Sequence, residues 1–98
     1  MNSIIHRTVL DTPVVNLVVV GVKSYKEAET IAIELVSQGV KAIELVSQGV
    51  KAIELCAAFG NEGIALISKA VRGKASVGAV RFDHHPGFDF KSGDELFK

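Results

Sequence analysis

The sequence predicts an α/β protein, a small β-α-β-α-β unit whose three strands form a parallel sheet. Apolar runs typical of strands alternate with segments in which apolar residues recur at helical spacing. The 98 residues are 48% hydrophobic and 22% charged, which is enough for one small core and too apolar for a disordered chain. Because strands that alternate with helices are normally joined by right-handed crossovers, we expect a parallel sheet within a single domain over residues 1–98.

The first predicted strand and helix lie in the N-terminal third of the chain. Residues 16–22 read Asn-Leu-Val-Val-Val-Gly-Val, a β-branched run that is typical of a strand covered on both faces. Ser24 is a suitable N-cap, and Glu27 completes a capping box. The apolar residues that follow at helical spacing are Ala28, Ile31, Ala32, Leu35 and Val36. The helix is expected to end at Gly39 or at Gly49, since glycine commonly terminates helices.

Two further strands flank a second predicted helix. Residues 50–56 are predicted to form the second strand, and residues 75–82 the third. Between them, residues 62–71 carry an apolar stripe with Asn61 as the expected N-cap and Gly73 beyond the C-terminal end. This order completes the β-α-β-α-β unit.

A perfect ten-residue repeat interrupts this pattern. Residues 32–41 read AIELVSQGVK, and residues 42–51 repeat them letter for letter. The period is too short for a solenoid, whose units run to about 20 residues or more. We interpret the repeat as a local tandem duplication, natural or engineered, within one domain.

The extra ten residues have two possible placements. They lengthen the first helix to residues 25–48, or they add a strand over residues 40–46, since the same letters are predicted to form a strand in the last copy. We favour the helix because three residues are an awkward connection between parallel strands. A helix that overshoots its strand would carry the rest of the chain onto a neighbouring molecule, which predicts a domain swap.

The small sheet also raises the question of its second face. If both helices cover one face, the apolar side chains on the other require a second copy of the chain, which predicts a homo-oligomer. We assign Leu17, Val19, Val77 and Val80 to that open face. A strand order 2-1-3 with one helix on each face would instead permit a monomer.

Composition excludes several classes of function. Eleven basic residues balance eleven acidic ones, so we expect neither a nucleic-acid partner nor a charged membrane surface. The longest apolar run is too short to span a bilayer, which needs about 20 residues. One cysteine cannot form an intramolecular disulfide, and the first residues do not resemble a secretory signal, so we expect a cytoplasmic protein.

Any functional site should lie at the carboxyl ends of the parallel strands. The candidate ligand-binding residues there are Glu54, Cys56, Phe59, Gly60, Arg81, Asp83 and His85. Cys56 and His85 are the candidate catalytic residues, as a thiolate near a helix N-terminus and as a general acid or base. Cys56 is more simply explained as a small buried hydrophobic residue, and His85 as a residue that fixes the following Pro-Gly turn. No metal site and no particular cofactor are predicted.

Three neighbouring features carry weaker signals. Arg81 is expected to pair with Glu54 or Asp83 rather than to hold an anionic ligand. Residues 60–63, Gly-Asn-Glu-Gly, open a helix and resemble a phosphate cradle, but their spacing is incomplete and Glu62 would repel an anion. The C-terminal tail, residues 91–98, is expected either to fold over the strand ends as a lid or to dock its apolar residues on a partner.

These segments resemble a known family. Val20-Gly21-Val22, Glu54-Leu55-Cys56 with Phe59-Gly60 and Gly63, Val80-Arg81-Phe82-Asp83 with His85-Pro86-Gly87, and Gly93-Asp94 together resemble small prokaryotic α/β proteins of a domain-of-unknown-function family. The resemblance covers most of the chain and implies the fold, but it brings no activity. Members carry a further N-terminal strand and lack the ten-residue repeat.

The sequence therefore leaves two classes of function open. The first is binding of a small ligand, with or without catalysis, at the carboxyl ends of the strands. The second is a non-catalytic structural or interaction module that acts as a homo-oligomer.

Overall fold

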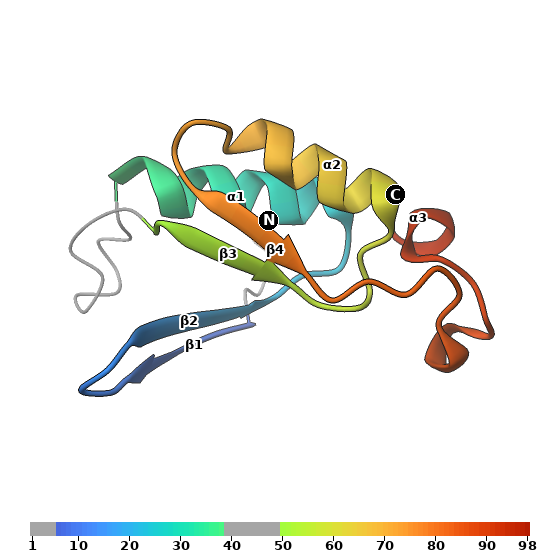
Figure 1. Ribbon diagram of the computed structural model, residues 1–98, viewed down its shortest axis with the longest axis horizontal. Coiled ribbons are helices and arrows are strands. Elements are labelled where there is room, and N and C mark those ends of the chain that lie inside the picture. The colour runs from blue at the N-terminus through green and yellow to red at the C-terminus, as the bar shows by residue number, and fades with distance from the viewer. Residues whose placement is uncertain (1–5, 39–49) are drawn as a thin grey trace.

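A computed structural model describes residues 6–38 and 50–98 (Figure 1). The elements in chain order are β1 (His6–Asp11), β2 (Asn16–Gly21), α1 (Tyr25–Gln38), β3 (Ala52–Leu55), α2 (Asn61–Ala70), β4 (Ser76–Ala79), the 3₁₀ turn η1 (Pro86–Phe88) and α3 (Gly93–Leu96). The strands form two two-stranded sheets, β1–β2 and β3–β4. The predicted mixture of helices and strands is confirmed, but the three-stranded parallel sheet is wrong.

The first predicted strand forms as β2, but its partner is β1. The two strands are antiparallel, with a register that runs from His6 opposite Gly21 to Asp11 opposite Asn16. The Thr12 hydroxyl accepts hydrogen bonds from the N–H groups of Val14 and Val15 at 3.2 and 3.0 Å and so fixes the connecting turn. A short loop closes at little entropic cost, so β2 pairs with its neighbour in sequence rather than across a crossover.

Strands β3 and β4 form the parallel pair that the β-α-β pattern predicts. Their register runs from Ala52 opposite Ser76 to Leu55 opposite Ala79. Both strands are shorter than the predicted ranges 50–56 and 75–82. Val50 lies outside the ladder because its N–H donates to the carbonyl of Leu35 in α1 at 2.9 Å.

Local signals define the helix termini. The N–H of Glu27 donates to Ser24 Oγ at 3.2 Å, and Glu27 Oε1 accepts from the N–H of Lys23 at 2.9 Å, which confirms Ser24 as the cap of α1. The N-cap of α2 is Gly60, so the prediction of Asn61 is wrong. The two placements considered for the duplicated segment concern residues 39–49, which lie outside the described residues.

The core lies between the helices and one face of the strands. Helices α1 and α2 pack together on the same side of β3–β4 (Figure 1), so the arrangement with one helix on each face is wrong. Ile67 and Val71 are fully buried at the centre of this core. The other members of this cluster are Tyr25, Ala28, Ala32, Val36, Leu55 and Phe59. No helix in the described ranges is long and apolar enough to cross a membrane.

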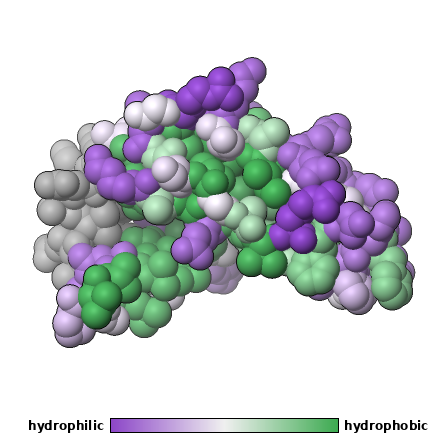
Figure 2. Space-filling model, in the orientation of Figure 1, coloured by the Kyte–Doolittle hydropathy of each residue, from purple (hydrophilic) through white to green (hydrophobic). Residues whose placement is uncertain are grey.

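The opposite face of the strands is open. Side chains alternate along a strand, and Leu17, Val19 and Val80 are 45%, 47% and 61% exposed. Figure 2 shows apolar side chains over the β1–β2 hairpin, at the lower left of the view. Val77 was assigned to the open face, but it packs against the helix-side core, so that assignment is wrong.

Candidate functional site

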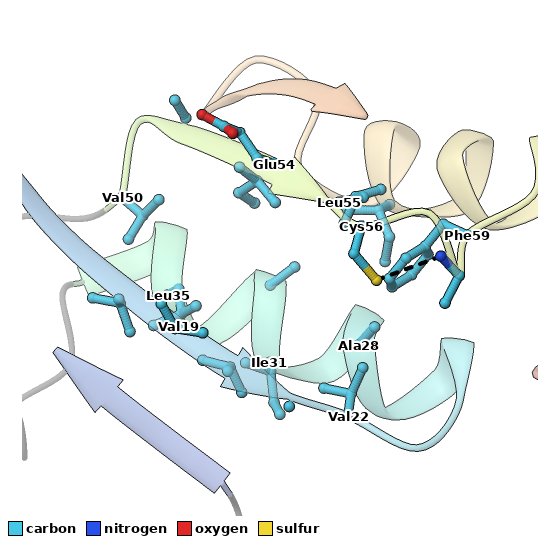
Figure 3. Close-up of a pocket in the computed structure, with 18 of the residues that line it drawn as sticks. Val19, Val22, Ala28, Ile31, Leu35, Val50, Glu54, Leu55, Cys56 and Phe59 are labelled. Carbon is cyan, nitrogen blue, oxygen red and sulfur yellow. Dashed lines mark hydrogen bonds between the residues drawn. The ribbon is translucent and has the colours of Figure 1, made fainter. Parts of the chain in front are cut away.

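A groove that could hold a ligand lies between β2 and β3. Its volume is about 820 Å³. Val20 and Val22 contribute to one wall and Val50 to the other, and Ile31 and Leu35 of α1 form the floor (Figure 3). The lining is mostly apolar, which is typical of small-molecule sites.

The groove exists because the two sheets do not join. In the described part of the chain, β2 pairs with β1 and β3 pairs with β4, and no ladder links β2 to β3. Both strands still pack on α1 through their helix-facing side chains. The result is an opening over α1, at the position that a central strand of a continuous sheet would occupy.

Two polar side chains lie at the β3 side of the groove. Glu54 is exposed and points away from α1 (Figure 3). Cys56 follows the last residue of β3, and its Sγ accepts from the N–H of Ala58 at 3.5 Å. Because the Cys56 side chain is exposed, its interpretation as a buried hydrophobic residue is wrong. Helix α2 begins at Asn61, so Cys56 lies in the short loop that leads from β3 to the N-terminus of this helix.

The N-terminus of α2 holds a carboxylate from the chain itself. The N–H groups of Glu62 and Gly63 donate to Asp94 Oδ2 and Oδ1 at 2.9 and 3.0 Å. The Tyr25 hydroxyl donates to Asp94 Oδ1 at 2.7 Å and accepts from the N–H of Gly60 at 2.9 Å. Asp94 therefore occupies the position that the Gly60–Gly63 segment would offer to a phosphate. We call these five residues the Tyr25–Asp94 cluster.

This arrangement shifts the pKa of both side chains in the cluster. Burial, together with the hydrogen bond to the Asp94 carboxylate, raises the pKa of Tyr25 from 10.0 to about 12, although the hydrogen bond from the Gly60 N–H acts in the opposite direction. Partial burial opposes ionisation of Asp94, but the hydrogen bonds from Glu62, Tyr25 and Gly63 outweigh it and hold the pKa of Asp94 below its usual 3.8. The cluster therefore stabilises the ionised form of Asp94 and the neutral form of Tyr25.

Close approach of neighbouring segments explains two glycines of the motifs. A Cβ atom at Gly93 would overlap the carbonyl oxygen of Ala58. A Cβ atom at Gly63 would overlap the ring of Tyr25. Any larger side chain at either position would push α3 or α1 away from the start of α2.

His85 lies in the C-terminal segment, where it fixes a turn. Its Nδ1 accepts from the N–H of Gly87 at 2.8 Å, as the turn interpretation predicts. Its ring lies 4.6 Å from the ring of Phe82 and 4.7 Å from that of Phe88, centroid to centroid. His85 does not line the groove, whereas Cys56 does.

Arg81 and Asp83 have other partners than expected. Arg81 Nε donates to Asn61 Oδ1 at 2.6 Å, and within the described residues Arg81 forms no ion pair with Glu54 or Asp83. The Asp83 carboxylate accepts from the N–H of His84 at 2.8 Å, and this bond holds the pKa of Asp83 below its usual 3.8. Neither residue lines the groove.

The predicted site is thus divided among three places. Glu54, Cys56 and Phe59 line the groove. Gly60 belongs to the Tyr25–Asp94 cluster, and the remaining candidates, Arg81, Asp83 and His85, lie along the C-terminal segment. Over residues 6–38 and 50–98, no three His, Cys, Asp or Glu side chains come together as a metal site would require.

Sequence reasoning missed Tyr25 and Asp94 as organising residues. Ser92 caps α3 by accepting from the N–H of Asp94, and a Ser-x-Asp pattern after a loop is the local signal that could have located this helix. The capping of α2 by Asp94 leaves no local signal, because the two elements are distant in sequence. Tyr25 had no signal beyond its place at the start of α1.

Comparison with protein families extends the resemblance seen in the motifs. The family described as "Family of unknown function (DUF6506)" matches residues 1–46 and 44–95. The chain belongs to this family. The first matched segment ends and the second begins within the second copy of the ten-residue repeat, which agrees with a duplication inside a DUF6506 chain. The comparisons with curated proteins and with solved structures give no match.

Several motif residues of this DUF6506 protein meet at the Tyr25–Asp94 cluster. Gly60, Gly63 and Asp94 are members of the cluster, and Gly93 lies against Ala58 beside it. Phe59 stacks on the Tyr25 ring, with centroids 5.4 Å apart and planes at 10°. These motif residues therefore dock the C-terminal segment on α2, while Glu54 and Cys56 face the groove.

Proposed function

We propose that this DUF6506 protein binds a small ligand with an apolar body in the groove between β2 and β3. The observation that carries the proposal is the opening itself, about 820 Å³ in volume and lined mostly by apolar side chains. Small-molecule sites typically have volumes of about 300–1,000 Å³ and an apolar lining with a few polar groups.

Glu54 and Cys56 are the polar groups that orient the ligand. Both lie at the carboxyl end of β3, where α/β proteins commonly bind ligands. The Glu54 carboxylate accepts hydrogen bonds, and the Cys56 thiol offers a weak donor at the rim. His85, Arg81 and Asp83 have no role in this proposal because they do not line the groove.

An apolar fluorescent dye tests the proposal, with Cys56 as a second reporter. We expect the dye to bind the folded protein and to slow the reaction of Cys56, the single cysteine, with a thiol reagent. Ala52→Trp places a bulky side chain at the groove and should weaken dye binding at least tenfold. Ala79→Trp is the matched control, because Ala79 is also an exposed strand alanine but does not line the groove.

Three results would contradict this function. The first would be failure of the folded protein to bind the dye. The second would be equal binding of the dye by the two tryptophan variants, and the third would be an unchanged reaction rate of Cys56 when the dye is bound. Circular dichroism of each variant establishes that it is folded before binding is compared.

We propose a homo-oligomer as the second candidate function, because the open face carries exposed apolar side chains. Leu17 and Val19 on β2 and Val80 after β4 are all at least 45% exposed. Size-exclusion chromatography with light scattering should give a mass above 10.4 kDa, and Val19→Lys should restore the monomer mass. Val14→Lys, in the β1–β2 turn, is the control and should leave the assembly intact. A monomer at every protein concentration would contradict the proposal.

The duplication offers a test of the swapped form of this oligomer. Deleting one ten-residue copy gives the same sequence whichever copy is removed, and it shortens the connection between α1 and β3. A swap driven by the longer connection predicts a smaller oligomer after the deletion. An unchanged mass would rule the swap out.

A further inference from the structure

Within residues 6–38 and 50–98, the edge of β3 that faces the groove has no strand paired to it. The carbonyl of Lys51 accepts from the N–H of Ser76 at 2.9 Å, and the carbonyl of Leu55 accepts from the N–H of Val80 at 3.1 Å. Main-chain groups alternate sides along a strand, so Lys51 and Leu55 face β4 while Ala52 and Glu54 direct their N–H and C=O groups to the other side. That side is the groove.

The opposite wall of the groove is also a strand edge. Strand β2 is bonded to β1 along one side, and over Leu17–Gly21 its other side borders the groove. The groove thus has hydrogen-bonding main chain on both walls and the apolar floor of Ile31 and Leu35 beneath. An aliphatic ligand would leave both edges to water, whereas an extended polypeptide would pair with them.

The size of the groove matches one strand. A strand of about five residues is about 16 Å long and takes up about 4.8 Å of sheet width and about 10 Å of thickness, or about 800 Å³. The groove measures about 820 Å³. The opening is therefore large enough to take a strand of this length.

We propose that the ligand of the groove is an extended, apolar peptide segment of about five residues that adds as a strand between β2 and β3. The inference rests on the proposed function and names its ligand class. The peptide main chain bonds to Ala52 and Glu54, continuing the β3–β4 ladder, and on its other side continues β1–β2. Alternate apolar side chains of the peptide point toward α1, against the partly buried Val20, Val22 and Val50 that pack on Ile31 and Leu35.

The experiment uses a synthetic probe with the chain's own strand sequence, acetyl-Val-Lys-Ala-Ile-Glu-Leu-amide, and the full-length protein. Amide hydrogen exchange is followed by NMR at Ala52 and Glu54. We expect both amides to exchange rapidly in the free protein and at least tenfold more slowly with the peptide bound. Probes N-methylated at every second residue lose the donors along one edge, so each of the two isomers should bind at least tenfold more weakly.

Three outcomes overturn the proposal. Equal binding of the N-methylated probes would show that main-chain pairing plays no part. Protection of Ala52 and Glu54 in the free protein at every concentration would show that the chain itself already pairs with this edge of β3. Protection that grows with protein concentration would show that a second copy takes the groove.

The dye separates failure of this inference from failure of the proposed function. If the dye binds and the peptide does not displace it, the groove holds a small apolar molecule and only the peptide assignment is wrong. If neither dye nor peptide binds, the proposed function is wrong, and this inference with it.

Discussion

The Tyr25 hydroxyl donates a hydrogen bond of 2.7 Å to Asp94, a residue 69 positions later in the chain. This contact joins the first residue of α1 to the second residue of α3, and the same carboxylate caps α2. Three helices are therefore held together at one carboxylate. The contact docks the C-terminal segment on the N-terminal ends of α1 and α2.

Replacing Asp94 by alanine should destabilise the protein by about 1–3 kcal/mol. The change leaves the N–H groups of Glu62 and Gly63 and the Tyr25 hydroxyl without their acceptor, and loss of a helix cap alone typically costs about 1 kcal/mol. Urea unfolding followed by circular dichroism measures the difference. Glu95→Ala, an exposed acidic neighbour in α3, is the control and should change stability little. Equal effects of the two changes would contradict the capping role.

The capping role also predicts an acid-sensitive contribution to stability. The pKa of Asp94 is lower in the folded protein than its usual 3.8, so the unfolded chain binds the proton more tightly. The contribution of Asp94 to stability is complete above its pKa in the unfolded chain, and it is lost as pH falls from about 4 through its pKa in the folded protein. Asp94→Asn should make the free energy of unfolding depend less on pH on the acid side, as measured by urea unfolding from about pH 2 to about pH 6. If the difference in free energy of unfolding between the wild-type protein and Asp94→Asn stayed constant with pH, the capping role would be contradicted.

Tyr25 should ionise at unusually high pH. It is the single tyrosine and the chain has no tryptophan, so the ultraviolet absorbance of tyrosinate reports on this residue alone. Burial and the Asp94 carboxylate raise the pKa of Tyr25 to about 12. The contribution of neutral Tyr25 to stability is therefore complete below about pH 10 and is lost as pH rises toward about 12. Asp94→Asn removes the neighbouring charge and should lower the midpoint. A wild-type midpoint near 10 in the folded protein would show that Tyr25 is not buried against Asp94.

A methyl group at Gly93 should disrupt the docking of α3. The added Cβ would overlap the Ala58 carbonyl oxygen, and overpacking of this kind typically costs about 1–3 kcal/mol. Gly78→Ala is the matched control, since a Cβ there meets nothing within 4 Å. Thermal unfolding should show a lower melting temperature for Gly93→Ala only. Equal melting temperatures for the two variants would mean that α3 does not pack closely on Ala58.

Local signals were sufficient for the start of α1 and for the presence of α2, and they were insufficient for α3 and for the sheet. Ser24 and Glu27 lie within one turn of each other, so the start of α1 could be predicted from adjacent residues. The pairing of β2 with β1 depends on a turn at Thr12 that the strand pattern did not reveal. The residues of β3 and β4 were predicted as strands, but their ends depend on contacts such as that of Val50 with α1.

The candidate site was predicted in part for the same reason. Glu54, Cys56 and Phe59 lie together because they follow one strand, and short-range position is what a sequence shows. His85 and Arg81 were expected beside them because parallel strands end at one edge. The chain leaves β4 after Ala79 and carries both residues into the C-terminal segment, where Phe82, Phe88 and Asn61 hold them.

The letters Ala-Ile-Glu-Leu show most clearly where the sequence suffices and where the tertiary structure decides. At residues 32–35 they form a turn of α1, and at residues 52–55 they form β3. Composition, capping residues and apolar spacing by themselves determined that this chain mixes helices with strands, because those signals act between near neighbours. Which conformation these four residues adopt, and whether β2 joins β1 or β3, depends on contacts between distant segments, such as burial of Leu55 against Ile67 and Val71 in the core and the β3–β4 ladder.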